Sequence, residues 1–105
     1  VAIAHQSAYA TSKHGVIGLT RAAAVEYSEH GIRVNAVLPG VIQTPIIDSL
    51  EETHPGFKEA LLAKHPFGRL GSPRDIAEAV AWLGSDAAAF ATGSLFNIDG
   101  GYLAI

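Results

Sequence analysis

The chain has 105 residues, of which 49% are hydrophobic and 16% are charged, and its formal net charge is −3. This composition predicts one folded domain with a real core and excludes a disordered chain. The absence of a Lys/Arg cluster argues against a nucleic-acid surface, and the absence of cysteine excludes disulfides and thiolate chemistry. No apolar run is long enough to cross a bilayer and no secretory signal opens the chain, so we expect a soluble, cytoplasmic protein.

The first part of the chain predicts a helix followed by a strand. Apolar residues recur every three or four positions over residues 8–30, which is typical of a helix, and Gly31 is the residue type that ends one. Residues 32–38 are short and rich in branched apolar side chains, which predicts a strand. Pro39 and Gly40 then predict a turn.

The middle of the chain predicts a helical excursion. Thr44 and Pro45 are typical of a helix start, with the Thr44 hydroxyl as N-cap and the proline at the first helical position. The segment 46–67 is interrupted by a His-Pro-Gly break at 54–56. It therefore predicts two short helices, or a helix and a loop.

The last part predicts a helix and a second strand. Ser72 and Asp75 have the spacing of a capping box. The helix that follows is expected to bury an apolar face made of Ile76, Ala77, Val80, Ala81, Leu83 and Gly84. Residues 94–98 predict a strand, closed by an Asp-Gly-Gly turn at 99–101.

Two strands joined by a long helical crossover are most simply parallel neighbours, which predicts an α/β fold. Two parallel strands with helices on both faces are not stable alone. We therefore expect further strands before Val1, which is not a methionine, and interpret residues 1–105 as the C-terminal portion of a single Rossmann-like doubly wound sheet, a three-layer α/β/α fold in the parent protein.

Tyr9 and Lys13 lie four positions apart in the first predicted helix, so their side chains share one face. A nearby ammonium favours the phenolate and lowers the phenol pKa, which would suit Tyr9 to move a proton to or from a carbonyl or alcohol oxygen. Spacing alone leaves the alternative open, because the same pair occurs in many purely structural helices.

Three sequence blocks accompany this pair, at residues 9–45, 71–86 and 91–101. Together they closely resemble the C-terminal half of the classical short-chain dehydrogenase/reductase family over essentially the whole chain. The resemblance implies an oxidoreductase that interconverts an alcohol and a ketone or aldehyde by hydride transfer, with NAD or NADP as cofactor. It also implies a small-molecule alcohol or carbonyl substrate.

The resemblance assigns roles to individual residues. Tyr9 corresponds to the catalytic acid/base and Lys13 to the lysine that lowers its pKa and binds the nicotinamide ribose. The turn of Pro39, Gly40, Val41 and Ile42 corresponds to the loop that holds the nicotinamide carboxamide. Thr44 corresponds to a threonine that contacts the cofactor, and residues 44–68 correspond to the substrate lid. The parent protein is expected to be a homo-oligomer, a dimer or tetramer.

Three family elements are absent from the printed sequence: the glycine-rich pyrophosphate turn, the Asn-Ala-Gly element and the catalytic serine. Ser7 and Ser12 are too close to Tyr9 in sequence to replace that serine. We therefore expect the 105 residues alone to be inactive. Two alternatives remain: a truncated, non-catalytic module that pairs with a full-length relative, and a family member that binds a nucleotide without chemistry.

The five histidines show no metal-ligand spacing, so no metal site is predicted. They are interpreted as solvated or locally hydrogen-bonded side chains, and a substrate contact by His65 in the lid is the alternative. Trp82 is interpreted as packing against the sheet or at a subunit interface rather than as a ligand contact.

Overall fold

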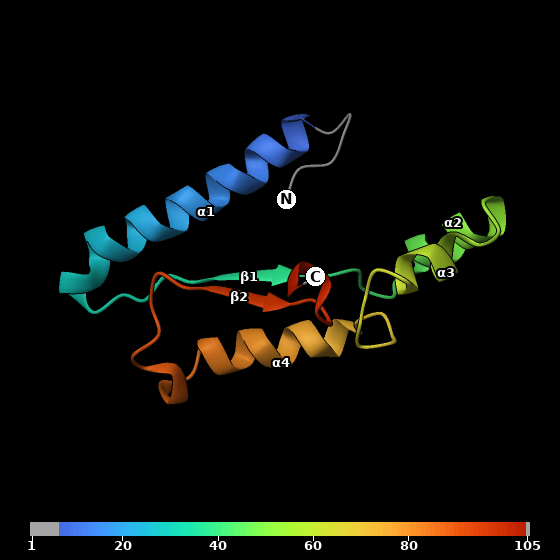
Figure 1. Cartoon of the computed structure of the whole chain (residues 1–105). Helices are drawn as coiled ribbons and strands as arrows, with labels where there is room; N and C mark the ends of the chain where they lie inside the picture. Colours follow the sequence, from blue (N-terminus) through green and yellow to red (C-terminus); the bar gives the residue numbers. More distant parts are fainter. Residues whose placement is uncertain (1–6, 105) are drawn as a thin grey trace. The chain divides into compact units, whose positions relative to one another are not determined.

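The computed structural model describes residues 7–104, which divide into two compact units. The first unit combines the described part of Val1–Ala36 with Ala88–Phe96, and the second combines Val37–Ala87 with the described part of Asn97–Ile105. Figure 1 shows the elements in chain order: α1 (Ser7–Tyr27), η1 (Ser28–His30), β1 (Ala36–Pro39), α2 (Pro45–Thr53), α3 (Phe57–Leu62), α4 (Pro73–Leu83), η2 (Asp86–Ala88), β2 (Leu95–Ile98) and η3 (Tyr102–Ala104).

The long helix of the first unit is confirmed, with its last turn tightened into the 3-10 helix η1. Gly31 ends it with φ 72°, the left-handed conformation that glycine adopts without a steric cost. The buried residues of α1 are Thr20 and Ala24. A Cβ added at Gly93 would lie 3.4 Å from the Ala24 methyl, so the segment before β2 packs closely on the C-terminal half of α1.

The two strands pair in parallel, which confirms the α/β fold class (Figure 1). The amide of Ala36 donates to the Ser94 carbonyl, and the amide of Gly40 donates to the Ile98 carbonyl, each at 3.0 Å. The strand predicted at 32–38 begins too early, because β1 begins only at Ala36. It also extends one residue further than predicted, since Pro39, which was expected in the turn, belongs to β1. Before β1, side-chain hydrogen bonds take the place of backbone pairing between the strands. The Asn35 side-chain NH₂ donates to the Ala91 carbonyl, and its side-chain oxygen accepts from the Ser94 amide.

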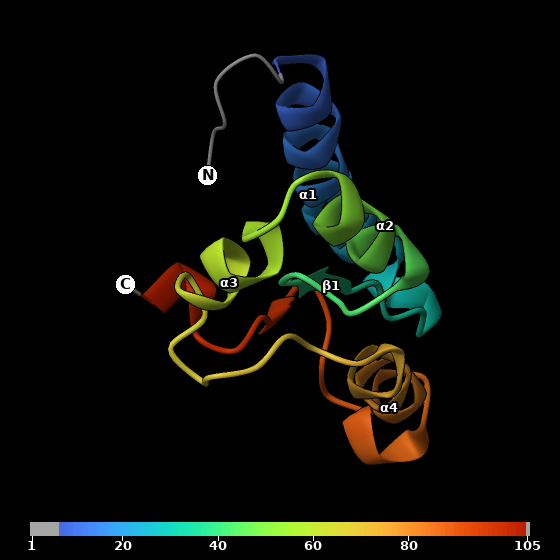
Figure 2. The same ribbon diagram turned by 90° about the vertical axis from the view of Figure 1, so that its right-hand side faces the viewer.

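The predicted break at 54–56 is confirmed, since α2 ends at Thr53 and α3 begins at Phe57 (Figure 2). The Glu51 carboxylate joins the two helices by accepting from the amides of Gly56 and Lys58, at 3.1 and 2.7 Å. These backbone donors hold the pKa of Glu51 below its usual value. The capping box of α4 is also confirmed, with the amide of Asp75 donating to the Ser72 hydroxyl and the amide of Ser72 to the Asp75 carboxylate.

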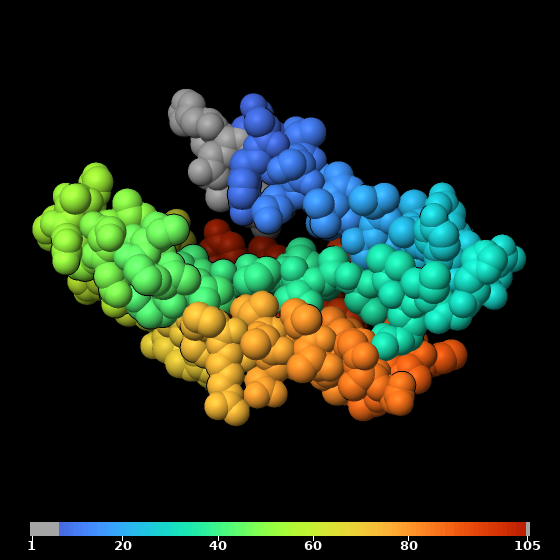
Figure 3. Space-filling view, turned by 180° about the vertical axis from the view of Figure 1, so that it is seen from behind, coloured from blue at the N-terminus to red at the C-terminus, as the bar shows by residue number. Residues whose placement is uncertain are grey.

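The core of the described residues is small, and this corrects the expectation for α4. Over residues 7–104, three hydrophobic side chains are buried, those of Ala24, Leu70 and Ala88. The apolar face predicted to be buried on α4 is not: no residue of that helix is buried, and Val80 is 53% exposed. The α4 segment lies uncovered on the face in Figure 3. Trp82 is 47% exposed, so its packing at a subunit interface stays a prediction.

In the part of the chain that the structure describes, none of the helices has both the length and the apolar character that crossing a bilayer requires.

Candidate active site

Tyr9 and Lys13 lie on one face of α1, as their spacing predicts. The Lys13 Nζ atom is 5.2 Å from the centroid of the Tyr9 ring, a cation–π distance. The Tyr9 side chain is 56% exposed, so its phenol can meet a small molecule. The Ser12 hydroxyl donates to the Tyr9 carbonyl at 2.8 Å, which is the local bonding of an ordinary helix residue and agrees with leaving Ser12 out of the site.

The second unit carries the loop that follows β1. Its backbone approaches that of Asp99 closely at Gly40, where an added Cβ would lie 2.8 Å from the Asp99 Cα and 3.0 Å from the Asp99 carbonyl oxygen. Real Cβ atoms do not approach backbone so closely, so only glycine lets the two strand ends lie together here. The sequence predicts a turn at Gly40 but gives no sign of this contact, because its partner is far along the chain.

The backbone of Val41 to Gln43 is held on one side by Gly71. The Val41 carbonyl accepts from the Gly71 amide at 3.0 Å, and the Gln43 amide donates to the Gly71 carbonyl at 2.7 Å. Successive residues of an extended chain point their peptide groups to opposite sides, so the N–H and C=O of Ile42 face away from Gly71. Among the described residues no hydrogen bond uses either group.

This arrangement fits the predicted cofactor loop. A carboxamide offers one acceptor oxygen and an NH₂ donor, and the Ile42 backbone offers the complementary donor and acceptor on one residue. Polar backbone groups that the protein does not pair are the groups a ligand can satisfy. Ile42 is therefore suited to hold the carboxamide of a nicotinamide.

Thr44 occupies the N-cap position of α2 and Pro45 begins the helix, as predicted, but the predicted hydroxyl cap is wrong. The Thr44 side chain makes no capping hydrogen bond. Instead, the backbone carbonyl of Thr44 accepts from the Ile47 amide at 3.0 Å, a 3-10-type bond that tightens the first turn.

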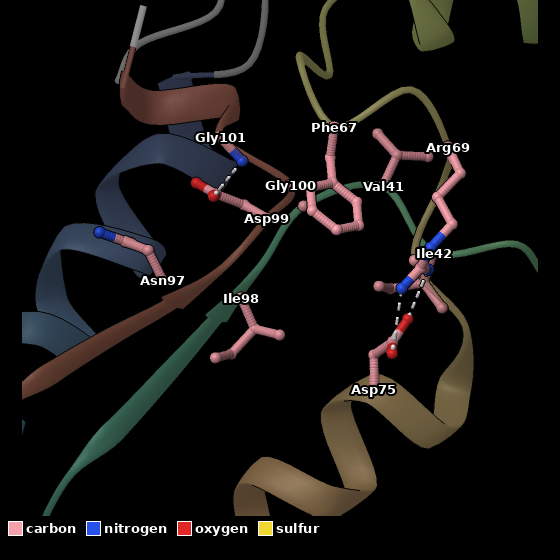
Figure 4. A pocket seen from close by; sticks show the side chains of 12 residues that line it. Val41, Ile42, Phe67, Arg69, Asp75, Asn97, Ile98, Asp99, Gly100 and Gly101 are labelled. Carbon is pink, nitrogen blue, oxygen red and sulfur yellow. Dashed lines mark hydrogen bonds and ion pairs between the residues drawn. The ribbon is translucent and has the colours of Figure 1, made fainter.

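The carboxyl ends of the strands open into a cavity of about 340 Å³ within the second unit, and Gly40, Val41 and Ile42 line it. Figure 4 shows Arg69 and Asp75 on one side, the Asp99–Gly101 turn on the other, and Phe67 between them. Ligands of open α/β sheets bind at this end of the strands. Of the cofactor residues predicted in this unit, Pro39 and Thr44 do not line the cavity.

An ion pair that the sequence analysis did not identify lies in one wall of the cavity. Arg69 donates to Asp75 at 2.8 Å, and its guanidinium lies 5.4 Å from the centroid of the Phe67 ring. The Arg69 guanidinium and then the Ser72 amide hold the pKa of Asp75 well below its usual range, and Asp75 raises the pKa of Arg69. The capping-box signal at Asp75 was visible in the sequence, but its ionic partner was not.

His65 is a locally hydrogen-bonded side chain, as the sequence analysis favours, and not a substrate contact. Its side chain is buried, with 3% of its surface exposed, and it contacts backbone on both sides rather than opening toward the cavity. A substrate contact by His65 is therefore wrong. Within residues 7–104, no group of three or more His, Asp or Glu side chains is arranged to hold a metal ion.

Comparison with known proteins decides the family. A family model described as enoyl-(acyl carrier protein) reductase matches residues 1–103. The chain belongs to the short-chain dehydrogenase/reductase family. It is 48% identical to a cyclohexanol dehydrogenase of an Acinetobacter species over 102 residues, which are 97% of this chain and 38% of that enzyme. The chain thus spans about two fifths of the length of this curated relative.

Solved structures of the family share the fold. A 4-hydroxyisoleucine dehydrogenase complexed with NADH matches with a TM-score of 0.92 and 37% identity, covering 100% of this chain and 43% of that one. ElxO with NADP bound matches with a TM-score of 0.85 and 38% identity, covering 92% of this chain and 39% of that one. Members of this short-chain dehydrogenase/reductase group have therefore been crystallised with either nicotinamide cofactor.

Proposed function

We propose that this chain is the catalytic C-terminal portion of an NAD(P)-dependent oxidoreductase that interconverts an alcohol and a ketone or aldehyde. The observation that carries the proposal is the Tyr9/Lys13 pair, a phenol and an ammonium 5.2 Å apart (Nζ to ring centroid) on one exposed helix face. The backbone of Ile42, with a donor and an acceptor suited to a carboxamide, supports it independently.

In this proposal Tyr9 is the acid/base. When an alcohol is oxidised, the Tyr9 phenolate accepts the hydroxyl proton, and when a carbonyl is reduced, the phenol returns that proton to the oxygen. Lys13 stabilises the phenolate through its positive charge and donates to the nicotinamide ribose hydroxyls. When bound, NAD(P) supplies the hydride acceptor or donor that the side chains of this chain cannot supply.

We assign the cofactor contacts to the loop after β1. The N–H and C=O of Ile42 hold the carboxamide and so select which face of the nicotinamide is presented. Pro39, Gly40 and Val41 shape the turn, and the close Gly40–Asp99 contact keeps it in place. The Thr44 hydroxyl, which makes no capping bond, contacts the cofactor beside the N-terminus of α2.

Residues 44–68 form the substrate lid in this proposal, and their side chains suggest an apolar substrate. Ile46 and Phe67 are each 70% exposed, so the lid presents apolar surface that a ring can cover. Because a relative at 48% identity is a cyclohexanol dehydrogenase, we propose cyclic secondary alcohols and their ketones as the substrate class.

The 105 residues alone are proposed to be inactive, since their sequence holds no glycine-rich turn for the pyrophosphate. Robust NAD(P)H turnover by the purified 105-residue chain would contradict this.

We also propose that the intact gene product is a homo-oligomer, because α1 exposes Val16, Leu19 and Val25. Light scattering of that product tests this point, and a monomer would contradict it.

The reaction is tested by isotope transfer in the intact gene product. Cyclohexanol deuterated at its carbinol carbon is incubated with NAD or NADP, and the reduced cofactor is analysed by mass spectrometry. Transfer of one deuterium to one face of the nicotinamide is expected. Oxidation without deuterium transfer would overturn the proposed function. So would the absence of cofactor turnover both with a panel of cyclic alcohols and NAD or NADP and with the matching ketones and NADH or NADPH.

A further inference from the structure

His65 is a buried titratable side chain that the proposed reaction does not use. It follows α3, and only 3% of its surface is exposed. Its Nδ1 atom lies 2.8 Å from the Leu61 carbonyl oxygen, and its Nε2 atom lies 3.2 Å from the Val41 amide nitrogen. The ring therefore connects the end of the lid segment to the loop after β1.

The chemistry of its two partners fixes the state of the ring. The Leu61 carbonyl can only accept a hydrogen bond, so Nδ1 must carry the proton. The Val41 amide can only donate, so Nε2 must be unprotonated. The imidazole is thus neutral, with its proton on Nδ1, and acts as a bridge that accepts at one end and donates at the other.

The ring is held in this orientation by the C-terminal turn. Tyr102 stacks on the imidazole, with ring centroids 5.4 Å apart and planes inclined by 23°. Gly100, at φ +59°, lies against the same side chain, because a Cβ there would be 3.7 Å from the His65 Cδ2 atom. The amide of Phe67 donates to the Gly100 carbonyl at 3.0 Å. The imidazole is therefore packed in place and has little freedom to turn away from Val41.

Val41 is consequently held at both of its polar groups. Its N–H donates to His65, and its carbonyl accepts from Gly71 at 3.0 Å. Both bonds lie on one side of the extended backbone, so they turn the polar groups of Ile42 to the other side. The orientation of Ile42 thus depends on an acceptor placed beside the preceding residue.

We propose that His65 is a positioning residue for nicotinamide binding: by accepting from the Val41 amide, it holds Ile42 in the orientation that receives the carboxamide. The inference rests on the proposed function, since it assumes that Ile42 binds that group. His65 touches neither cofactor nor substrate in this account. It acts through Val41. Binding of ADP-ribose, the part of the cofactor that lacks nicotinamide, therefore does not depend on His65.

The test compares two ligands on the intact gene product. Dissociation constants are measured by calorimetry for whichever of NADH and NADPH the wild type binds, and for the matching ADP-ribose, which lacks nicotinamide. The variant His65→Leu removes the acceptor and leaves the Val41 amide without its hydrogen-bond partner. It is expected to weaken binding of the reduced cofactor about tenfold and to change ADP-ribose binding less than about twofold.

Two further variants sharpen the comparison. His65→Gln can place its side-chain oxygen where Nε2 lies, so it is expected to restore most of the cofactor affinity. His30→Leu removes an exposed histidine outside the site and is expected to bind both ligands like the wild type. Equal weakening of both ligands by His65→Leu, or no weakening of either, would overturn the inference. A wild type that binds neither NADH nor NADPH would instead overturn the proposed function.

A measurement on the wild type without cofactor covers the case in which His65→Leu does not fold. Nitrogen-detected NMR of the imidazole is expected to show the neutral form with its proton on Nδ1, and the Val41 amide is expected to exchange slowly with solvent. A proton on Nε2, or exchange of the Val41 amide as fast as an exposed loop, would contradict the proposed bridge.

Discussion

Lys13 Nζ lies 5.2 Å from the centroid of the Tyr9 ring, one helical turn along α1 and on the same exposed face. The pair comes from one helix, so its geometry depends only on the local backbone and not on how distant segments fold. That geometry places a positive charge beside the group that is proposed to move the proton, and it gives the two side chains separable roles.

Replacement of Lys13 is expected to harm both cofactor binding and proton transfer. In the intact gene product, Lys13→Met should raise the KM for the cofactor and lower kcat by about tenfold or more, because the phenolate of Tyr9 loses its stabilising charge. Arg21→Met removes a positive charge from the same helix and serves as the control. Steady-state kinetics of the two variants provide the measurement, and equal effects of both would argue against a specific role for Lys13.

Gly40 is expected to tolerate no side chain. A Cβ at this position would lie 2.8 Å from the Asp99 Cα, so Gly40→Ala should push the strand ends apart and destabilise the protein by about 1–3 kcal/mol. Gly84→Ala is the control, since its Cβ would meet nothing closer than 3.5 Å, and a change within about 0.5 kcal/mol is expected. Urea unfolding gives both values. A Gly40→Ala protein as stable as the wild type would show that the strand ends do not meet.

The Arg69–Asp75 pair predicts a dependence of stability on acid pH. Because its native pKa lies below the ordinary value of 3.8, the Asp75 carboxylate contributes stability above that pH, and the contribution is lost as pH falls through the native pKa. Asp75→Asn should therefore be less stable than the wild type near neutral pH, with a difference that shrinks in acid below the ordinary pKa.

Urea midpoints of both proteins across this range check the expectation. Glu78→Gln is the matched control, because its pair with Arg74 on the same helix is exposed on both sides. It should change the midpoints little at any pH. A difference between wild type and Asp75→Asn that grows in acid would contradict the assigned roles of Arg69 and Ser72.

Features encoded by neighbouring residues could be predicted from the sequence. The helix end at Gly31, the break at residues 54–56 and the capping box of Ser72 and Asp75 each depend on the conformation or hydrogen bonding of a few adjacent residues. The shared face of Tyr9 and Lys13 is of the same kind. These local rules hold regardless of what the rest of the chain does.

Features that depend on distant partners could not be predicted. The strand predicted at 32–38 begins late because the Asn35 side chain, rather than the backbone, bonds to Ala91 and Ser94. No pattern of neighbouring residues indicates these side-chain hydrogen bonds. The sequence position of His65 places it in the predicted lid, but it gives no sign of the hydrogen bond to Val41, 24 positions away. The apolar face predicted on α4 was inferred from periodicity, which reports which residues share a face but not whether anything covers it.

The central claim is that the Tyr9 hydroxyl moves the proton, and a variant without that hydroxyl tests the claim most directly. Tyr9→Phe and its control Tyr27→Phe, on the same helix, are compared with the wild type for cofactor binding and for kcat with a cyclic alcohol. Tyr9→Phe is predicted to bind cofactor with unchanged affinity and to lose about a hundredfold or more in kcat, while Tyr27→Phe remains active. A Tyr9→Phe enzyme with wild-type kcat would contradict the account.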